Sequence, residues 1–241
     1  MRVSFVSPNN PGSYRSAQVV AENLGIAQLG SYIQSLGHIV QLVDARLWDL
    51  GPIAASELVK TFAPDAVGLS LISQQAVTWA NAFLTDLSFA SGKPIILVGG
   101  YFPTLLPEPA LTLMPLVDAV VLGEGEPVLK ELLLRFTQHA TDWLSTAGLC
   151  SRRNGTSFRR TPRPPLTQDL DSLPAPMRYA APFMDDQFEV LVEGSRAGVH
   201  PIAPFAQSDR SSGVPGDTLG GGELRGASLP KCSRSANSSP A

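Results

Sequence analysis

Short apolar runs alternate with amphipathic stretches over the first 140 residues or so of the chain. The runs are apolar at nearly every position, which is typical of strands buried on both faces of a sheet. The stretches between them have helical spacing, as where Ile26, Leu29, Ile33 and Leu36 precede Gly37. The pattern predicts strands over residues 3–7, 39–44, 66–71, 94–98 and 119–122. It predicts helices over residues 25–36, 54–62, 75–90, 107–114 and 127–138.

Five units of a strand followed by a helix indicate an α/β fold. With right-handed crossovers, they predict a doubly wound, five-stranded parallel sheet of the flavodoxin-like (Rossmann-like) type. Ligands of such sheets lie beyond the carboxyl ends of the strands. The loops that follow the first, third, fourth and fifth strands are therefore the segments in which we expect functional residues.

The composition of the chain changes after residue 140. Residues 141–187 are rich in Arg and Pro, which predicts a linker with turns. Residues 188–193 are mostly apolar and predict a short strand. Residues 197–241 are dominated by Gly, Ala, Ser and Pro, so we expect this tail to be disordered. The expected organisation is a domain over 1–140, a linker, a strand region over 188–196, and the tail.

Charge and cysteine content exclude several classes of protein. The chain has 18 basic and 21 acidic side chains, so it lacks the broad basic surface expected of a nucleic-acid-binding protein. No apolar run reaches the roughly 18 residues of a membrane span, and the N-terminus does not resemble a signal peptide. Cys150 and Cys232 are too few for a disulfide framework or a thiolate-only metal site. We therefore expect a cytoplasmic protein.

The loops at the predicted carboxyl edge contain small and polar residues. The loop over residues 7–14 includes Asn9 and Asn10 and has neither a dinucleotide-binding nor a P-loop glycine motif. The third strand ends in Ser70-Leu71-Ile72, where the Ser70 hydroxyl is able to face a ligand crevice. A serine in this position can equally serve as a helix cap.

Glycines follow the fourth and fifth predicted strands. Gly99 and Gly100 remove side chains at a point where a ligand, or a neighbouring helix, comes close to the backbone. Gly123 and Glu124 precede a predicted helix, where an acidic side chain can also complement the helix dipole. The remaining candidates at this edge are Tyr101 and Thr104.

The order and spacing of these segments resemble those of cobalamin-binding domains. Ser70-Leu71-Ile72, followed after residues 73–98 by Gly99-Gly100, is similar to the Ser-x-Leu and Gly-Gly pattern of that family. Ile72 stands where the pattern has Leu. Further segments resemble cobalamin-binding radical-SAM proteins, and the likeness extends over residues 1–196. These segments are residues 22–33, 36–45, 64–70 and 121–126.

The resemblance implies that the serine and the glycines line a slot for the nucleotide tail of a corrinoid. It also implies that cobalt has no protein ligand below it, because the loop over residues 7–14 lacks the Asp-x-His-x-x-Gly motif of many cobalamin domains. We expect this His-off state, no catalytic residue and no metal-ligating residue. The candidate cofactor-binding residues are Asn9, Asn10, Ser70, Ile72, Gly99, Gly100, Tyr101, Thr104, Gly123 and Glu124.

The resemblance further implies that intact relatives carry a radical-SAM barrel, in which Cys-x-x-x-Cys-x-x-Cys holds a [4Fe–4S] cluster that binds S-adenosylmethionine. Residues 190–196 resemble the first strand of that barrel, which places the cysteines near Gly198, Ile202 and Phe205. None of these is Cys, so we expect a module that holds a corrinoid without performing radical chemistry alone. The sequence from residue 197 onward is then either a natural tail or a degenerate or out-of-frame remnant. A separate radical-SAM partner chain stays open.

Proteins with two other functions use the same type of sheet. A flavodoxin-like module could bind another small cofactor such as flavin, although no phosphate-binding Ser/Thr-rich loop follows the first strand. A phospho-signalling receiver needs an acceptor Asp at the end of the third strand, where this chain has Ser70. The corrinoid-binding module is therefore the preferred interpretation.

Overall fold

The apolar runs of the N-terminal part form five parallel strands of a single sheet. The structure is a computed structural model that describes residues 1–9, 22–87, 92–154, 157–179, 191–192 and 203–204. The parallel strands are β1 (Arg2–Ser7), β2 (Ile39–Asp44), β3 (Ala66–Ser70), β4 (Ile95–Gly99) and β5 (Ala119–Val121). Their spatial order is β2-β1-β3-β4-β5, so the chain reverses direction across the sheet between β1 and β3. The expected α/β class is confirmed.

Helices connect these strands close to the expected positions. They are α1 (Leu24–Ser35), α2 (Pro52–Phe62), α3 (Val77–Asp86), α4 (Tyr101–Leu105), α5 (Pro107–Leu113) and α6 (Gly125–Thr137). Asn23 is the N-cap of α1, and its side-chain oxygen accepts a hydrogen bond from the Ile26 amide. Pro52 begins α2, where its missing N–H would have had no helical partner. The short helix α4, directly after β4, was not predicted.

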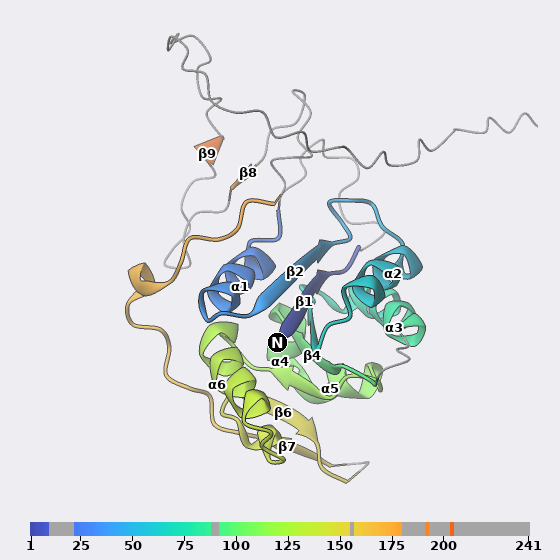
Figure 1. Ribbon diagram of the computed structural model, residues 1–241. Coiled ribbons are helices and arrows are strands. Elements are labelled where there is room, and N and C mark those ends of the chain that lie inside the picture. The colour runs from blue at the N-terminus through green and yellow to red at the C-terminus, as the bar shows by residue number, and fades with distance from the viewer. Residues whose placement is uncertain (10–21, 88–91, 155–156, 180–190, 193–202, 205–241) are drawn as a thin grey trace, which may run out of the picture. The chain divides into compact units, whose positions relative to one another are not determined.

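Alternate residues of the strands divide the core into two layers. Val3, Phe5 and Leu97 pack with α1 and α6 on one face of the sheet. Val6 and Val98 pack with α2, α3 and α5 on the other face. Figure 1 shows α1 and α6 together on one side, and α2 and α3 on the opposite side. Both faces of the parallel strands are thus covered, as their continuous apolar sequences require.

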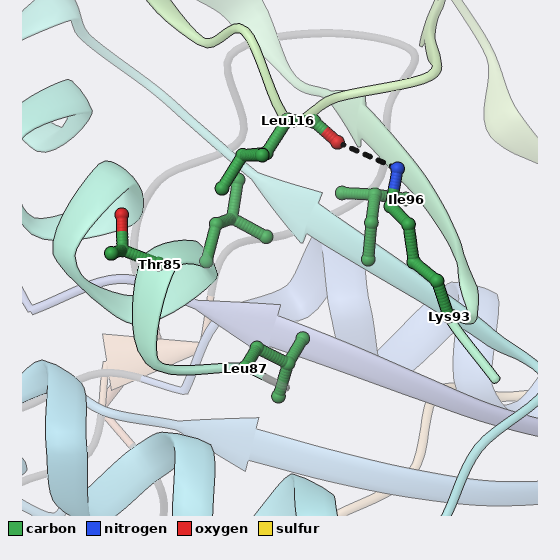
Figure 2. Close-up of a pocket in the computed structure, with 6 residues that line it drawn as sticks. Thr85, Leu87, Lys93, Ile96 and Leu116 are labelled. Atoms are coloured by element: carbon green, nitrogen blue, oxygen red, sulfur yellow. Dashed lines mark hydrogen bonds between the residues drawn. The ribbon is translucent and has the colours of Figure 1, made fainter. Parts of the chain in front are cut away.

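A hollow of about 210 Å³ lies on the α3 side of the sheet at the amino end of β4. Leu87, Ile96 and Leu116 supply apolar walls, and Lys93 Nζ donates to the Leu116 carbonyl oxygen at 3.3 Å (Figure 2). Because ligands of doubly wound sheets bind at the carboxyl ends of the strands, this hollow is not a candidate site.

The sheet has seven strands rather than the expected five. β6 (Leu149–Arg152) pairs antiparallel with β5, and β7 (Phe158–Arg160) pairs antiparallel with β6. Both strands lie within residues 141–187, the segment expected to be a linker. The buried run Leu149-Cys150-Ser151 pairs with β5 in the sheet. It is short and lies next to arginines in the sequence, so its apolar pattern does not stand out.

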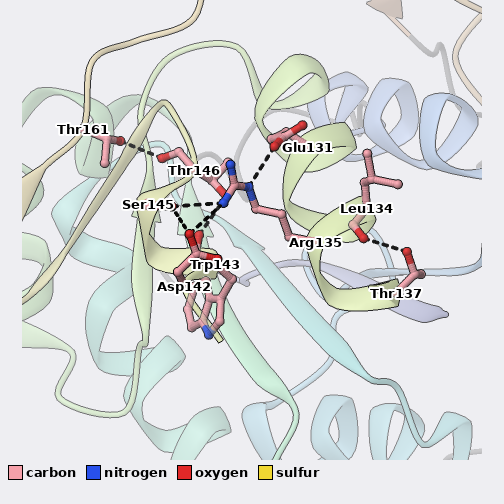
Figure 3. A network of polar contacts seen from close by, with 9 residues as sticks. All are labelled: Glu131, Leu134, Arg135, Thr137, Asp142, Trp143, Ser145, Thr146 and Thr161. Carbon is pink, nitrogen blue, oxygen red and sulfur yellow. Dashed lines mark hydrogen bonds and ion pairs between the residues drawn. The ribbon is translucent and has the colours of Figure 1, made fainter. Parts of the chain in front are cut away.

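Polar contacts hold the β6–β7 hairpin against α6. Arg135, in the last turn of α6, forms ion pairs with Glu131 and Asp142 at 2.8 and 3.2 Å, and donates to Ser145 Oγ (Figure 3). The Thr161 hydroxyl donates to the Thr146 carbonyl oxygen at 2.7 Å. The chain that leaves α6 is therefore fixed back onto the sheet.

Beyond the hairpin, the structure describes less of the chain. The chain has two compact units, Met1–Phe205 and Ala206–Ala241, and the second unit lies outside the described residues. So does most of the expected tail, residues 197–241. Leu191–Val192 (β8) and Ala203–Pro204 (β9) form an antiparallel pair. In the described parts of the chain, every helix is too short or too polar to cross a membrane.

Arg152 connects the hairpin to α5, and its removal should weaken the domain. Its guanidinium donates to the carbonyl oxygens of Leu111, Met114 and Val117 at the end of α5 and beyond. We expect Arg152→Leu to lower the free energy of unfolding by about 2–3 kcal/mol, because these acceptors lose charged donors. Denaturant unfolding measures the change, with the exposed Arg153→Leu as a control. Equal stability of the two variants would contradict this role.

Candidate functional site

A slot opens between the sheet and the helix pair α1 and α6, at the carboxyl ends of β3, β4 and β5. It has an open volume of about 70 Å³. The residues that line it are Phe5, Ile26, Leu29, Gly68, Leu69, Ser70, Leu97, Val98, Gly99, Gly100, Val121, Gly123, Gly125 and Leu129. The slot lies where ligands of doubly wound sheets bind.

The sheet side of the slot lacks a side chain at Gly99, between the apolar side chains of Leu97 and Val121. Ser70 is the register neighbour of Gly99, and two residues earlier Gly68 is the neighbour of Leu97. A Cβ placed on Gly99 would make only an ordinary 3.8 Å contact with Val121 Cβ, so the protein itself does not require glycine there. The missing side chain of Gly99 therefore leaves space for another molecule.

Gly100 has a different role, because the backbone itself requires it. Its φ is +99°, a conformation that L-residues rarely adopt. A Cβ at this position would also lie 2.5 Å from the Leu71 carbonyl oxygen. The adjacent Leu71 amide donates to the Gly99 carbonyl oxygen at 2.9 Å, which holds the ends of β3 and β4 together. Gly100 thus turns the chain sharply into α4 at the mouth of the slot.

Helices α1 and α6 form the opposite wall of the slot. Ile26 and Leu29 come from α1, and Leu129 comes from α6. The first residue of α6, Gly125, lies directly against the Leu29 side chain. Ser70 Oγ lies 4.0 Å from the position of a Cβ built on Gly25, so this hydroxyl faces α1 rather than the opposite layer. Apart from this hydroxyl of β3, the side chains that line the slot are apolar.

The remaining predicted residues lie at the mouth or farther away. Thr104 Oγ1 accepts a hydrogen bond from the Gly123 amide at 3.3 Å, and Glu124 Oε2 accepts one from the Thr167 amide at 3.0 Å. Ile72 and Tyr101 are 65% and 74% exposed.

The first loop contributes less to the described site. Asn9 donates through Nδ2 to Asp49 Oδ1 at 3.2 Å and does not line the slot. Asn10 lies outside the described residues. The structure therefore brings Ser70, Gly99, Gly100 and Gly123 together in the slot, and leaves Asn9 apart from them.

A buried polar cluster lies beside the slot, at the ends of β1 and β2. Tyr179 donates its hydroxyl to Asp44 Oδ2 at 2.6 Å and accepts from the Asn23 amide at 2.7 Å. The Asn23 side chain donates to Ser7 Oγ at 2.9 Å. Burial, reinforced by the Asp44 carboxylate, raises the pKa of Tyr179 far above its ordinary value. Tyr179 is therefore a neutral hydrogen-bond donor to a buried carboxylate.

Residues 167–179 connect the two helices that wall the slot, and we call this segment the clasp. At one end the Thr167 amide donates to Glu124, which caps α6. Farther along, the Pro174 carbonyl oxygen accepts from Gln28 Nε2 at 3.0 Å, and the Met177 amide donates to the Ala27 carbonyl oxygen. Tyr179 completes the clasp. The expected linker thus packs against the domain.

Sequence reasoning missed several residues that build this site. Gly68 was open to prediction, because it lies two residues before Ser70 and so faces the same side of the strand. Gly125 and Leu29 come together only through the packing of α1 on α6. Tyr179 carries no local signal, since its partner Asp44 is far away in sequence.

The described histidines lie away from the slot. His38 directly precedes β2, and its Nδ1 is 3.4 Å from the N-terminal nitrogen of Met1. Burial and that ammonium group lower the pKa of His38. His139 follows the end of α6, at the opposite end from the slot. Among the residues that the structure describes, no group of three or more His, Cys, Asp or Glu could hold a metal ion.

Comparison with known proteins agrees with this geometry. The model of the B12 binding domain family matches residues 14–133, which include the whole described slot apart from Phe5. Residues 14–133 of the chain therefore belong to the B12-binding domain family, which confirms the resemblance found in the sequence.

Two curated relatives have similar sequences. The chain is 30% identical over 176 residues to the anaerobic magnesium-protoporphyrin IX monomethyl ester cyclase of Synechocystis, covering 71% of this chain and 34% of the relative. It is 31% identical over 177 residues to an uncharacterised methyltransferase of Pyrococcus horikoshii, covering 73% of this chain and 38% of the relative. The chain thus spans little more than a third of these relatives.

Solved structures show the same fold. The cobalamin-dependent S-adenosylmethionine radical enzyme OxsB, with aqua-cobalamin and S-adenosylmethionine bound, superimposes with a TM-score of 0.57 at 19% identity. The match covers 73% of this chain and 24% of OxsB. The radical S-adenosylmethionine methyltransferase TsrM of Kitasatospora setae gives a TM-score of 0.56 at 16% identity, covering 72% of this chain and 31% of TsrM.

The clasp should contribute measurably to stability. Tyr179→Phe removes a donor to the buried Asp44 carboxylate and an acceptor for the Asn23 amide. We expect the free energy of unfolding to fall by about 1.5–3 kcal/mol, the usual range for a hydrogen bond to a charged group. Denaturant unfolding measures this change. The exposed Tyr101→Phe is the matched control, and a Tyr179→Phe variant as stable as this control would refute the contact.

Proposed function

We propose that the chain binds cobalamin, with the nucleotide tail of the corrinoid inserted into the slot between the sheet and helices α1 and α6. The observation that supports this most strongly is the open space above Gly99, where the sheet has no side chain, beside the Ser70 hydroxyl. A flat, largely apolar group fits this space, because it replaces the missing side chain and removes apolar surface from water.

The predicted residues other than Asn9 and Asn10 each have a defined task in this proposal. Gly99 leaves the space, and Ser70 offers a hydroxyl to the tail. Gly100 and Gly123, both with positive φ, shape the mouth. Ile72, Tyr101 and Thr104 stand at the rim, where they contact the part of the corrinoid outside the slot. Glu124 contributes indirectly, through its hydrogen bond to the clasp.

We also propose that the protein supplies no ligand to the lower face of the metal. Bound cobalamin supplies a cobalt centre able to carry a methyl group. His38 and His139 belong to the edge of the domain away from the slot, which supports a His-off state. His200 lies outside the described residues.

The proposed role is that of a cobalamin-holding module related to radical-SAM enzymes, rather than that of a complete catalyst. Within these 241 residues the cysteines are Cys150 and Cys232, so the sequence contains no Cys-x-x-x-Cys-x-x-Cys motif. Cys150 is buried, and burial raises the pKa of its thiol, which disfavours the thiolate that binds iron. A [4Fe–4S] cluster and S-adenosylmethionine would therefore have to be held by other protein material.

Binding is tested by adding hydroxocobalamin to the full chain and recording visible absorbance after gel filtration. We expect the wild type to retain the corrinoid. Gly99→Val should weaken binding at least tenfold, because its side chain enters the slot, where a Cβ at position 99 makes only an ordinary contact with Val121. Gly51→Val, at the cap of α2 with open space around it, is the matched control.

Retention by the wild type and by Gly51→Val, with loss in Gly99→Val, supports the proposal. If a wild-type chain shown to be folded by circular dichroism retains no corrinoid, the proposal is wrong. Parallel addition of FMN tests the other cofactor considered. Retention of FMN without cobalamin would favour a flavin-binding module on the same sheet.

The His-off state has its own spectroscopic test. After reduction of bound cobalamin to Co(II), we expect the electron paramagnetic resonance spectrum to lack the nitrogen splitting that an axial imidazole or benzimidazole produces. Nitrogen splitting that persists in His38→Ala and His139→Ala but disappears in His200→Ala would identify a histidine ligand. Such a result would overturn the His-off state while leaving cobalamin binding intact.

A further inference from the structure

The outer wall of the slot contains an unusually close pair of residues. Gly125, the first residue of α6, lies so near α1 that a Cβ built on it would be 2.8 Å from Leu29 Cδ2 and 3.3 Å from Leu29 Cδ1. Both residues line the slot. Gly125 does not have a positive φ, so its backbone accepts other residues and the constraint is one of space alone.

The contact between the Leu29 side chain and the backbone of Gly125 limits how closely α1 and α6 approach each other at the slot. The Leu29 side chain is half-buried and packs against the apolar layer that contains Ile26 and Leu129. A larger residue at position 125 would have to displace Leu29, and a smaller residue at position 29 would leave a gap facing the slot. The Leu29 side chain therefore forms the slot wall both on α1 and over the start of α6.

The side chains that line the slot are almost all apolar. Of the residues that line the described slot, Ser70 alone carries a polar side chain. A purine base placed there would bury a ring of donors and acceptors with few partners, which is costly. A benzimidazole base has fewer polar atoms and presents mainly carbon to the walls. The slot therefore suits an apolar, two-ring base.

We propose that Leu29 and Gly125 form a coupled wall that selects corrinoids by the base of their nucleotide tail, favouring benzimidazole over adenine. The inference rests on the proposed function, since it concerns the same slot. It assigns a specificity-determining role to two residues that are not among the predicted cofactor-binding residues. Leu29 packs on the base, and the absence of a side chain at Gly125 lets it do so.

The test compares ligands that differ only in the tail. Affinities of the full chain are measured by absorbance titration with cobalamin, with its adenine-containing counterpart, and with cobinamide, which lacks the nucleotide tail. The wild type should bind cobalamin at least tenfold more tightly than the adenine form. Equal affinity for the two bases would overturn the proposed selection.

A double-mutant cycle then tests the coupled wall. Leu29→Ala and Gly125→Ala should each weaken cobalamin binding about tenfold, since one removes apolar contact and the other displaces Leu29. The double variant should bind more tightly than the product of the two effects predicts, because the new methyl group occupies space vacated by Leu29. Cobinamide affinity should stay unchanged. Leu134→Ala, an exposed leucine on α6, is the control.

The outcomes separate this inference from the proposed function. If the wild type binds cobalamin but the two changes simply multiply, or weaken cobinamide equally, the coupled wall is refuted and cobalamin binding stands. If the folded wild type binds neither corrinoid, both proposals fall. Thermal unfolding of each variant shows whether a loss of affinity reflects the slot or a loss of folded protein.

Discussion

A helix that covers a sheet normally meets side chains at every second position of each strand, and those side chains determine how closely it packs. At the ends of β3 and β4 this chain places Ser70 and Gly99 on the face covered by α1 and α6, while the Phe5 ring occupies the space over Gly68. The helices do not collapse into the resulting gap, because Leu29 meets the backbone at Gly125. The slot thus results from the absent side chain at Gly99 on the sheet and from the contact of Leu29 with Gly125 between the helices.

A slot between a sheet and two helices persists only if both helices are held in place. The clasp does this with hydrogen bonds, and Tyr179 also packs against the apolar layer beneath α1 and α6. Tyr179 joins the start of α1 to the end of β2 through Asn23 and Asp44, and Thr167 reaches the cap of α6. Buried polar groups cost free energy unless they are paired, so each bond of this cluster also disfavours alternative positions of α1. The segment that looks like a linker in sequence therefore supports the wall of the site.

The sequence predicted the part of the fold that depends on local patterns. The five parallel strands and most helices follow from apolar runs and helical spacing, and Ser70 and Gly99 follow from their positions at strand ends. The hairpin β6–β7 was missed because its buried residues are embedded among arginines, one of which, Arg152, binds three carbonyl oxygens of the chain around α5. The pairs Leu29–Gly125 and Asp44–Tyr179 join distant segments, and no local pattern reports such contacts.

The geometry also explains how anchoring can be separated from chemistry. The slot is lined by backbone and apolar side chains and offers no group suited to acid–base work, since its one side-chain polar atom among the described lining residues is a serine hydroxyl. The exposed side chains of Ile72, Tyr101 and Leu105 follow β3 and β4 at the same edge of the sheet. On the proposed function, affinity would come from burying the tail in this slot. A domain built in this way would hold its ligand without depending on the reaction, which is consistent with sequence similarity to both a cyclase and an uncharacterised methyltransferase.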